Sequence, residues 1–138
     1  QQMQQQMQQQ MQQQMKQMEE THYKYEIGGK MEKSALHPEG RYTIIRCLGS
    51  GTYGRVLECS DEGGSGTNVA IKAVRAEPLY REAARREIKA LQKVGTHENV
   101  VSMLRSFDFE GHICVVQQLI RGGTLLERLS TAGGFRLD

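Results

Sequence analysis

Short runs of apolar residues, alternating or continuous, dominate the chain after residue 40 and predict a β-sheet. The alternation near 42–48 and over 55–60 is typical of strands with one buried face. Segment 68–74 is almost entirely apolar, so this strand should lie centrally with both faces packed. Two further runs, 101–109 and 112–120, are separated by a tight Glu-Gly turn. The pattern therefore predicts five antiparallel strands.

Residues 78–94 have the periodicity of an amphipathic helix. Pro78 suits the first helical turn and Gly95 suits the end. The predicted buried stripe consists of Ala84, Ile88 and Leu91. The other faces carry basic side chains, namely Arg81, Arg85, Arg86, Lys89 and Lys93. The expected fold class is thus α+β, with one principal helix on the sheet. A second helical pattern follows around Leu125, Leu126 and Leu129.

The first 40 residues differ from the rest in composition. Residues 1–20 are glutamines interrupted by methionines about every four positions, which would form one drifting helical stripe. That stripe could recruit a partner helix, but glutamine tracts of this kind are more often disordered or only partly helical. We therefore expect a solvated low-complexity tail over 1–20, a linker over 21–40 and a domain over 41–138. The initial glutamine suggests a fragment, a processed product or an incomplete gene model.

Composition and charge narrow the class of protein. The 138 residues are 38% hydrophobic and 25% charged, with a net charge of +2. These values are ordinary for a single globular domain and do not indicate direct nucleic-acid binding. No apolar run reaches the roughly 18 residues of a membrane span, and no secretory signal is recognisable, so we expect a cytoplasmic or nuclear protein without a membrane partner. The three cysteines, Cys47, Cys59 and Cys114, have no metal-ligand spacing and are expected to be reduced structural thiols.

A glycine motif lies between the first two predicted strands. It runs from Leu48 to Val56 and places Gly49, Gly51 and Gly54 in the pattern G-x-G-x-x-G. The same pattern opens dinucleotide-binding folds, but there the glycines precede a helix. Here an alternating strand follows, so the motif predicts a hairpin flap whose backbone N–H groups could face phosphate oxygens.

Lys72 provides the second element, because it lies within the most apolar strand. A buried ammonium group is costly unless it is paired. Glu87 lies fifteen residues later on the inward part of the predicted helix and is the natural partner. A purely structural ion pair is the alternative, and the glycine flap favours phosphate binding.

Together these pieces resemble the small lobe of a eukaryotic protein kinase. The glycine loop, the Val69-Ala70-Ile71-Lys72 strand and Glu87 are followed by His97-Glu98-Asn99-Val100-Val101, by Val116-Gln117-Gln118-Leu119-Ile120 and by Gly122-Gly123-Thr124-Leu125, in the order that the family has. The resemblance implies ATP as cofactor and protein as substrate, with Lys72 on the α and β phosphates and Glu87 holding Lys72. It also implies nucleotide contacts from Leu48, Gly49, Ser50, Gly51, Thr52, Tyr53, Gly54, Arg55, Val56, Ala70, Gln118, Ile120 and Thr124. Gln117 would be the gatekeeper, and Leu91 and Met103 would join the regulatory hydrophobic column.

The kinase group is less sharply indicated. Segments 82–88 and 112–116 are similar to the LAMMER, or CDC-like, dual-specificity kinases, whereas the hinge is closer to general Ser/Thr kinases. Gly51-Thr52-Tyr53-Gly54 also matches cyclin-dependent kinases, in which the threonine and the tyrosine are inhibitory phosphorylation sites. By that resemblance, a phosphoryl group on Thr52 or Tyr53 would repel the ATP phosphates.

The sequence contains no His-Arg-Asp, Asp-Phe-Gly or Ala-Pro-Glu segment. In the family these segments supply the catalytic aspartate and the Mg²⁺ ligands, so we expect the large lobe to be absent and this chain alone to be inactive. Two alternatives stay open. One is a non-catalytic, pseudokinase-like interaction module with a regulatory partner on the basic helix 78–94. The other, a dinucleotide-dependent oxidoreductase, is disfavoured by the order of elements.

Overall fold

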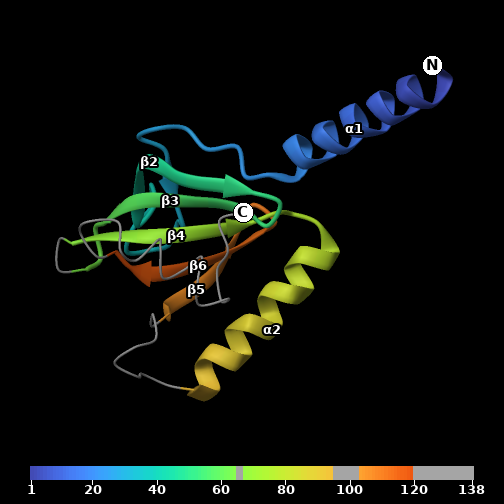
Figure 1. The fold of residues 1–138 in the computed structure, drawn as a ribbon. Coiled ribbons are helices and arrows are strands. Elements are labelled where there is room, and N and C mark those ends of the chain that lie inside the picture. The colour runs from blue at the N-terminus through green and yellow to red at the C-terminus, as the bar shows by residue number, and fades with distance from the viewer. Residues whose placement is uncertain (65–66, 95–102, 120–138) are drawn as a thin grey trace.

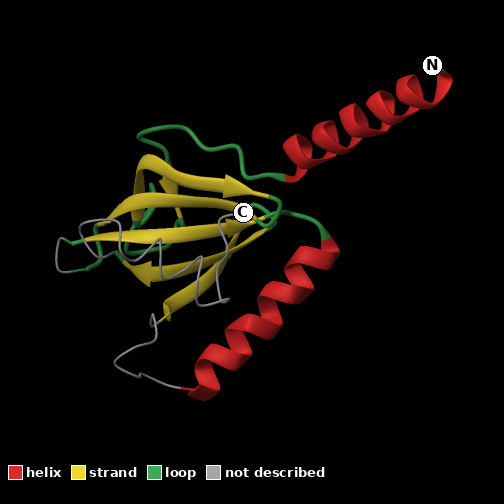
Figure 2. Cartoon of the chain, viewed as in Figure 1, coloured by secondary structure: helices red, strands yellow, loops and turns green. Residues whose placement is uncertain are grey.

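The computed structural model describes residues 1–64, 67–94 and 103–119, and its centre is one curled antiparallel sheet (Figures 1 and 2). Six strands occur in the order β1-β2-β3-β4-β6-β5. Their bounds are β1 Lys30–Met31, β2 Tyr42–Gly51, β3 Gly54–Asp61, β4 Asn68–Val74, β5 Met103–Phe109 and β6 His112–Gln118. The strand predicted as central, β4, lies between β3 and β6 and is buried from Val69 to Val74. That prediction is confirmed.

Alternation along the strands separates two faces of the sheet. On one face, Leu57 of β3, Ile71 of β4 and Val116 of β6 pack with the fully buried Tyr42 and Met31. Tyr42 also stacks on Phe107, with ring centroids 5.6 Å apart. This face holds the larger core.

The opposite face is partly covered by α2, Pro78–Val94 (Figure 1). Ala84 is buried, and Ile88 and Leu91 pack beside it against Val74, Ile113 and Val115. The predicted bounds and the predicted apolar stripe of this helix are both confirmed. α2 therefore lies across the face to which Lys72 belongs.

Two predictions of architecture are wrong in detail. The sheet has a sixth, two-residue strand, β1, which pairs with β2 through Lys30 and Met31. The residues expected to be disordered or only partly helical form α1, Gln2–Thr21. Glutamine and methionine are good helix formers, and no glycine, proline or β-branched residue interrupts residues 1–20.

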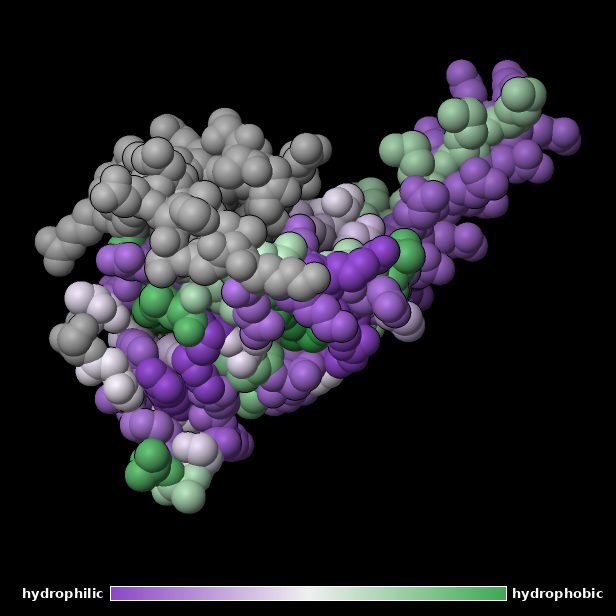
Figure 3. All heavy atoms as spheres, turned by 90° about the horizontal axis from the view of Figure 1, so that it is seen from below, coloured by the Kyte–Doolittle hydropathy of each residue, from purple (hydrophilic) through white to green (hydrophobic). Residues whose placement is uncertain are grey.

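α1 projects away from the sheet, as the space-filling view shows (Figure 3). None of its residues is buried. Its exposed methionines are Met3, Met7, Met11 and Met15. No helix in the described part of the chain is long and apolar enough to cross a membrane.

The segment predicted as a linker packs on the sheet. Tyr23 and Met31 are both part of the larger core. Glu32 receives two hydrogen bonds from the guanidinium group of Arg105, at 2.5 and 2.8 Å. Residues 21–40 therefore contribute to the folded unit. The helical pattern around Leu125 lies outside the described residues.

Candidate functional site

The glycine motif forms the tight turn between β2 and β3. Gly51 pairs with Gly54, so that Thr52 and Tyr53 form the tip. Gly54 has φ +145°, and a Cβ there would lie 2.2 Å from the carbonyl oxygen of Ala73. Gly49 and Gly51 are part of β2 and do not have a positive φ. Of the three glycines of the motif, Gly54 is therefore the one whose backbone conformation requires a glycine.

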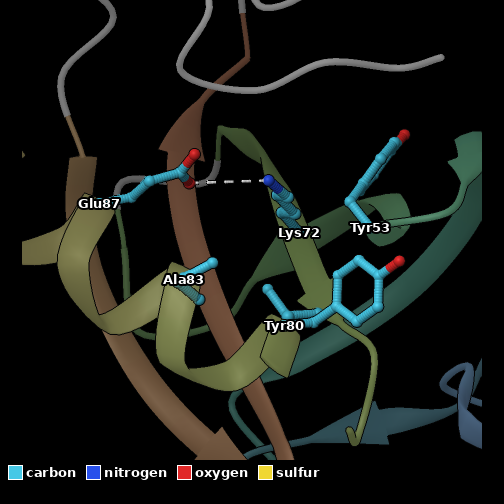
Figure 4. A pocket seen from close by; sticks show the side chains of 7 residues that line it. Tyr53, Lys72, Tyr80, Ala83 and Glu87 are labelled. Atoms are coloured by element: carbon cyan, nitrogen blue, oxygen red, sulfur yellow. Dashed lines mark ion pairs between the residues drawn. The ribbon is translucent and has the colours of Figure 1, made fainter. Parts of the chain in front are cut away.

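Lys72 lies on the next strand, directly opposite Val56 of β3 and Val115 of β6. It is 8% exposed. Its Nζ lies 3.8 Å from Oε2 of Glu87 on α2, and the two side chains point toward each other (Figure 4). The structure thus brings together the two residues that the sequence predicts as partners.

Burial controls the protonation of this pair. It lowers the pKa of Lys72, and the charge of Glu87 only partly opposes that effect. Burial likewise raises the pKa of Glu87, against the opposing effect of Lys72. An anionic group placed beside Lys72 would stabilise the ammonium form further.

A cavity of about 90 Å³ lies between the turn and α2. Its lining includes Lys72, Glu87 and Tyr53 of the turn, and Tyr53 lies beside Lys72 in Figure 4. Nζ of Lys72 lies 4.9 Å from the centre of the Tyr53 ring. The cavity is smaller than the roughly 300 Å³ or more of a whole small-molecule site. It suits one charged group rather than a complete ligand.

The other predicted site residues divide between the two faces of the sheet. Val56, which pairs with Lys72, and Ala70, which pairs with Glu58, are buried and lie on the face of Lys72. Arg55 pairs with Ala73 on the opposite face, and its guanidinium group donates to the carbonyl of Tyr23 at 2.7 Å. The side chain of Arg55 is therefore directed away from Lys72.

The remaining predicted nucleotide contacts lie in β2, in the glycine turn and at the end of β6. Leu48 is half-buried in β2, whereas Ser50 and Thr52 are exposed. Gln118 is exposed at the end of β6. The predicted nucleotide contacts Ile120 and Thr124 lie outside the described residues.

Gln117, the predicted gatekeeper, is 3% exposed and lies opposite Ala70 and Met103 in register. Its Nε2 has no hydrogen-bond partner among the described residues. A buried amide donor without a partner is unusual. It lies on the same face as Lys72, where a ligand could accept its hydrogen bond.

Sequence reasoning missed the residues behind the turn. Nε2 of His22 lies 2.7 Å from the carbonyl oxygen of Gly51, and the guanidinium group of Arg75 donates to the carbonyl of Thr52 at 3.1 Å. The first contact joins residues 29 positions apart. No local pattern in the sequence could have indicated it.

The described residues contain no group of three or more His, Cys, Asp or Glu side chains that could hold a metal ion. Glu87 is the acidic residue in the lining of the cavity, and it is already paired with Lys72. Within the described part of the chain, the ammonium group of Lys72 is the group in the lining that an anion could approach.

Comparison with known proteins agrees with this geometry. The family model described as "Protein kinase domain" matches residues 42–138. A crystal structure of a kinase domain superposes with a TM-score of 0.60 at 26% identity, covering 72% of this chain and 28% of the other.

Curated relatives include dual specificity kinases of the CLK type. CLK4 of Mus musculus is 42% identical over 85 residues, which cover 58% of this chain and 18% of that protein. The lkh1 kinase of Schizosaccharomyces pombe is 45% identical over 84 residues, or 57% of this chain and 12% of its own length. CLK2 of Mus musculus is 37% identical over 106 residues, which cover 73% of this chain and 20% of that protein.

This chain therefore spans at most about a fifth of each of these relatives. The resemblance to CDC-like kinases that the sequence suggests is confirmed by these matches. With the hairpin, the buried lysine on the central strand and its helical glutamate in place, the chain belongs to the protein kinase domain family.

Proposed function

We propose that this chain is the nucleotide-binding lobe of an enzyme that transfers the γ-phosphate of ATP to Ser, Thr or Tyr hydroxyls of protein substrates. The observation that carries the proposal is the Lys72–Glu87 pair beside the glycine turn. The relatives are named dual specificity protein kinases, which supports the choice of substrate class.

In this proposal each part of the lobe has a separate task. The ammonium group of Lys72 binds and orients the α and β phosphates, and Glu87 keeps that ammonium directed into the cavity. Backbone N–H groups of the turn 51–54 cover the phosphates. Val56 and Ala70 provide an apolar surface for the adenine, whose edge is bound near Gln118.

The family's mechanism requires Mg²⁺ ligands and a catalytic base, and the described residues contain no group of three or more His, Cys, Asp or Glu side chains that could hold a metal ion. We propose that both belong to a large lobe that a longer protein supplies, as the family's mechanism requires. The lobe described here then binds and orients the nucleotide.

The proposal is tested by measuring ATP affinity calorimetrically in the full-length protein that carries this chain. Lys72→Ala should weaken ATP binding at least about tenfold, since it removes a buried charge that faces the phosphates. Lys33→Ala is the matched control, because Lys33 is an exposed lysine outside the site.

Three results would be decisive. If the wild-type protein does not bind ATP, or if Lys72→Ala binds it as tightly as wild type, the proposed function is wrong. If ATP binds but no phosphate reaches Ser, Thr or Tyr peptides, the pseudokinase-like interaction module is the correct function.

Two finer proposals accompany this function. Arg85, Arg86 and Lys89 are exposed on α2, and this basic surface would suit an acidic regulatory partner. A cytoplasmic or nuclear location is also proposed, because Cys47, Cys59 and Cys114 are free, as is usual in a reducing compartment.

A further inference from the structure

The segment Thr21–Tyr25, here called the strap, leads from the end of α1 toward the sheet (Figure 1), and its His22 contacts the glycine turn. His22 and Tyr23 in the strap are 5% and 6% exposed. Such burial is unexpected for a polar segment that only connects a solvated helix to a sheet.

Three consecutive carbonyl groups of the turn are hydrogen-bonded from this side. Nε2 of His22 faces the carbonyl of Gly51, the guanidinium group of Arg75 donates to that of Thr52, and the backbone N–H of Arg75 donates to that of Tyr53. The distances are 2.7, 3.1 and 3.0 Å. The turn is thus fixed at each of its peptide groups from Gly51 to Tyr53.

Arg75 is itself held by the strap. Its Nε donates to Oγ1 of Thr21 at 2.8 Å, and the backbone N–H of the next residue, Ala76, donates to the carbonyl of Thr21 at 2.8 Å. Arg75 is 5% exposed, and its guanidinium group also pairs with Glu77 at 3.0 Å. The strap, Arg75 and the turn therefore form one connected network.

Fixing carbonyl groups also fixes N–H groups. In a trans peptide the carbonyl and the following N–H point in opposite directions, and the described chain has no cis peptide bond. When the carbonyls of Gly51 and Thr52 face the strap, the N–H groups of Thr52 and Tyr53 must face away from it. That is the orientation in which they could donate to phosphate oxygens.

His22 is well suited to this task. Both of its ring nitrogens face carbonyl oxygens, Nδ1 that of Met18 and Nε2 that of Gly51. A carbonyl oxygen only accepts hydrogen bonds, so the neutral ring protonated at Nε2 donates to Gly51 alone, and the ring donates to both carbonyls only when both nitrogens carry a proton. The contact with Met18 orients the ring from the last turn of α1.

We propose that the strap sets the nucleotide affinity of this lobe, with His22 and Arg75 as positioning residues for the glycine turn. This inference rests on the proposed function for its ligand, and on the described contacts alone for its effect on the turn. Residues N-terminal to the family match, which begins at 42, would thereby act on the site.

The experiment compares three variants in the full-length protein. His22→Leu removes the donor to Gly51, His22→Gln keeps a side-chain N–H near the position of Nε2, and Lys24→Ala changes an exposed residue of the same segment. The measurements are KM for ATP, kcat, hydrogen exchange of the amides of 49–54, and the thermal midpoint Tm.

His22→Leu should raise KM for ATP roughly 5- to 10-fold, as expected for one hydrogen bond, with little change in kcat. The amides of Thr52 and Tyr53 should exchange faster in this variant. His22→Gln should restore both properties to within about twofold, and Lys24→Ala should match wild type.

A purely structural role for His22 predicts something different. Tm would fall in His22→Leu and in His22→Gln alike, while KM and the exchange of the turn stayed at wild-type values, and that result would overturn the proposal. If the wild-type protein binds no ATP, the proposed function fails on its own, and the exchange data still decide whether the strap holds the turn.

Discussion

Gly54 shows how one residue determines the shape of the site. Its φ of +145° is strained for any side chain, and a Cβ would lie 2.2 Å from the carbonyl oxygen of Ala73. Gly54→Ala should therefore destabilise the protein by roughly 3 kcal/mol or more, because both backbone strain and a clash with backbone arise. Denaturant unfolding measures this change.

Gly111→Ala separates strain from the clash. Gly111 has φ +85°, but its nearest neighbour for a new Cβ is the Cβ of Ala76 at 3.9 Å. This variant should cost only about 1–2 kcal/mol, the strain of a left-handed residue. Equal losses for the two variants would contradict the role of the Ala73 contact.

At the residue scale, prediction from sequence succeeded where a local pattern marks the chemistry. A lysine in an apolar strand requires a partner, so Lys72 and Glu87 could be paired before their distance was known. His22 could not be identified, since its burial depends on a turn 29 residues away. Family resemblance alone indicated Gln117, and only the structure could show that its buried Nε2 has no hydrogen-bond partner among the described residues.

At the scale of elements, Glu58 of β3 links three adjacent strands through side-chain hydrogen bonds to β2 and β4. Its carboxylate accepts hydrogen bonds from Arg46 of β2 at 2.7 Å and from Asn68 of β4 at 2.8 Å. The hydrogen bond from Arg46 outweighs the effect of burial, and with Asn68 it lowers the pKa of Glu58. The charged form of Glu58 is thus favoured by folding.

This lowered pKa determines how the free energy of unfolding depends on pH. The stabilisation by ionised Glu58 is complete above the pKa of glutamate in the unfolded chain, which is about 4.3. It is lost as the pH falls through the lower pKa that Glu58 has in the folded protein. At pH 7, Glu58→Gln should reduce the free energy of unfolding by roughly 1–2 kcal/mol. The difference from wild type should shrink below about pH 4, as measured by urea unfolding at several pH values.

Glu39→Gln is the control for Glu58, because Glu39 is exposed and makes no described side-chain contact. Its stability curve should follow that of wild type throughout. A constant difference between Glu58→Gln and wild type down to pH 3 would show that packing, and not the charge, accounts for the loss.

Strands and α2 were predictable because their apolar periodicity reflects burial on the sheet. β1 has only two residues and exists through its pairing with Thr43 and Tyr42, so no periodicity could reveal it. α1 was underestimated because isolated short helices are marginal in water, whereas its end is anchored by the strap. A tertiary contact thus decided the structure of β1, whereas the helix propensity of glutamine and methionine decided that of α1.

At the scale of the whole molecule, the folded unit begins before the family match. The match starts at residue 42, yet Tyr23 lies in the main core, where its ring contacts His112 and Phe109 edge-on at 5.2 and 6.2 Å. α1, in contrast, has no buried residue. The N-terminal 40 residues therefore contain a dispensable part and an integral part.

Two truncations of the full-length protein distinguish these parts. Deletion of residues 1–14 keeps Met18 as acceptor for His22 and should change the free energy of unfolding by less than about 0.5 kcal/mol. Deletion of residues 1–25 removes the buried ring of Tyr23 and takes acceptors from Arg55 and Arg75. It should cost roughly 3–5 kcal/mol, as for loss of a buried aromatic side chain.

Denaturant midpoints with unchanged m-values would make the two truncations comparable. If both were equally stable, the strap would contribute nothing to the fold, and Arg55 and Arg75 would have to find other acceptors. If deletion of 1–14 alone were costly, α1 would stabilise the protein through contacts other than the strap. Only a loss that first appears when His22 and Tyr23 are removed assigns the stabilising contacts to the strap itself.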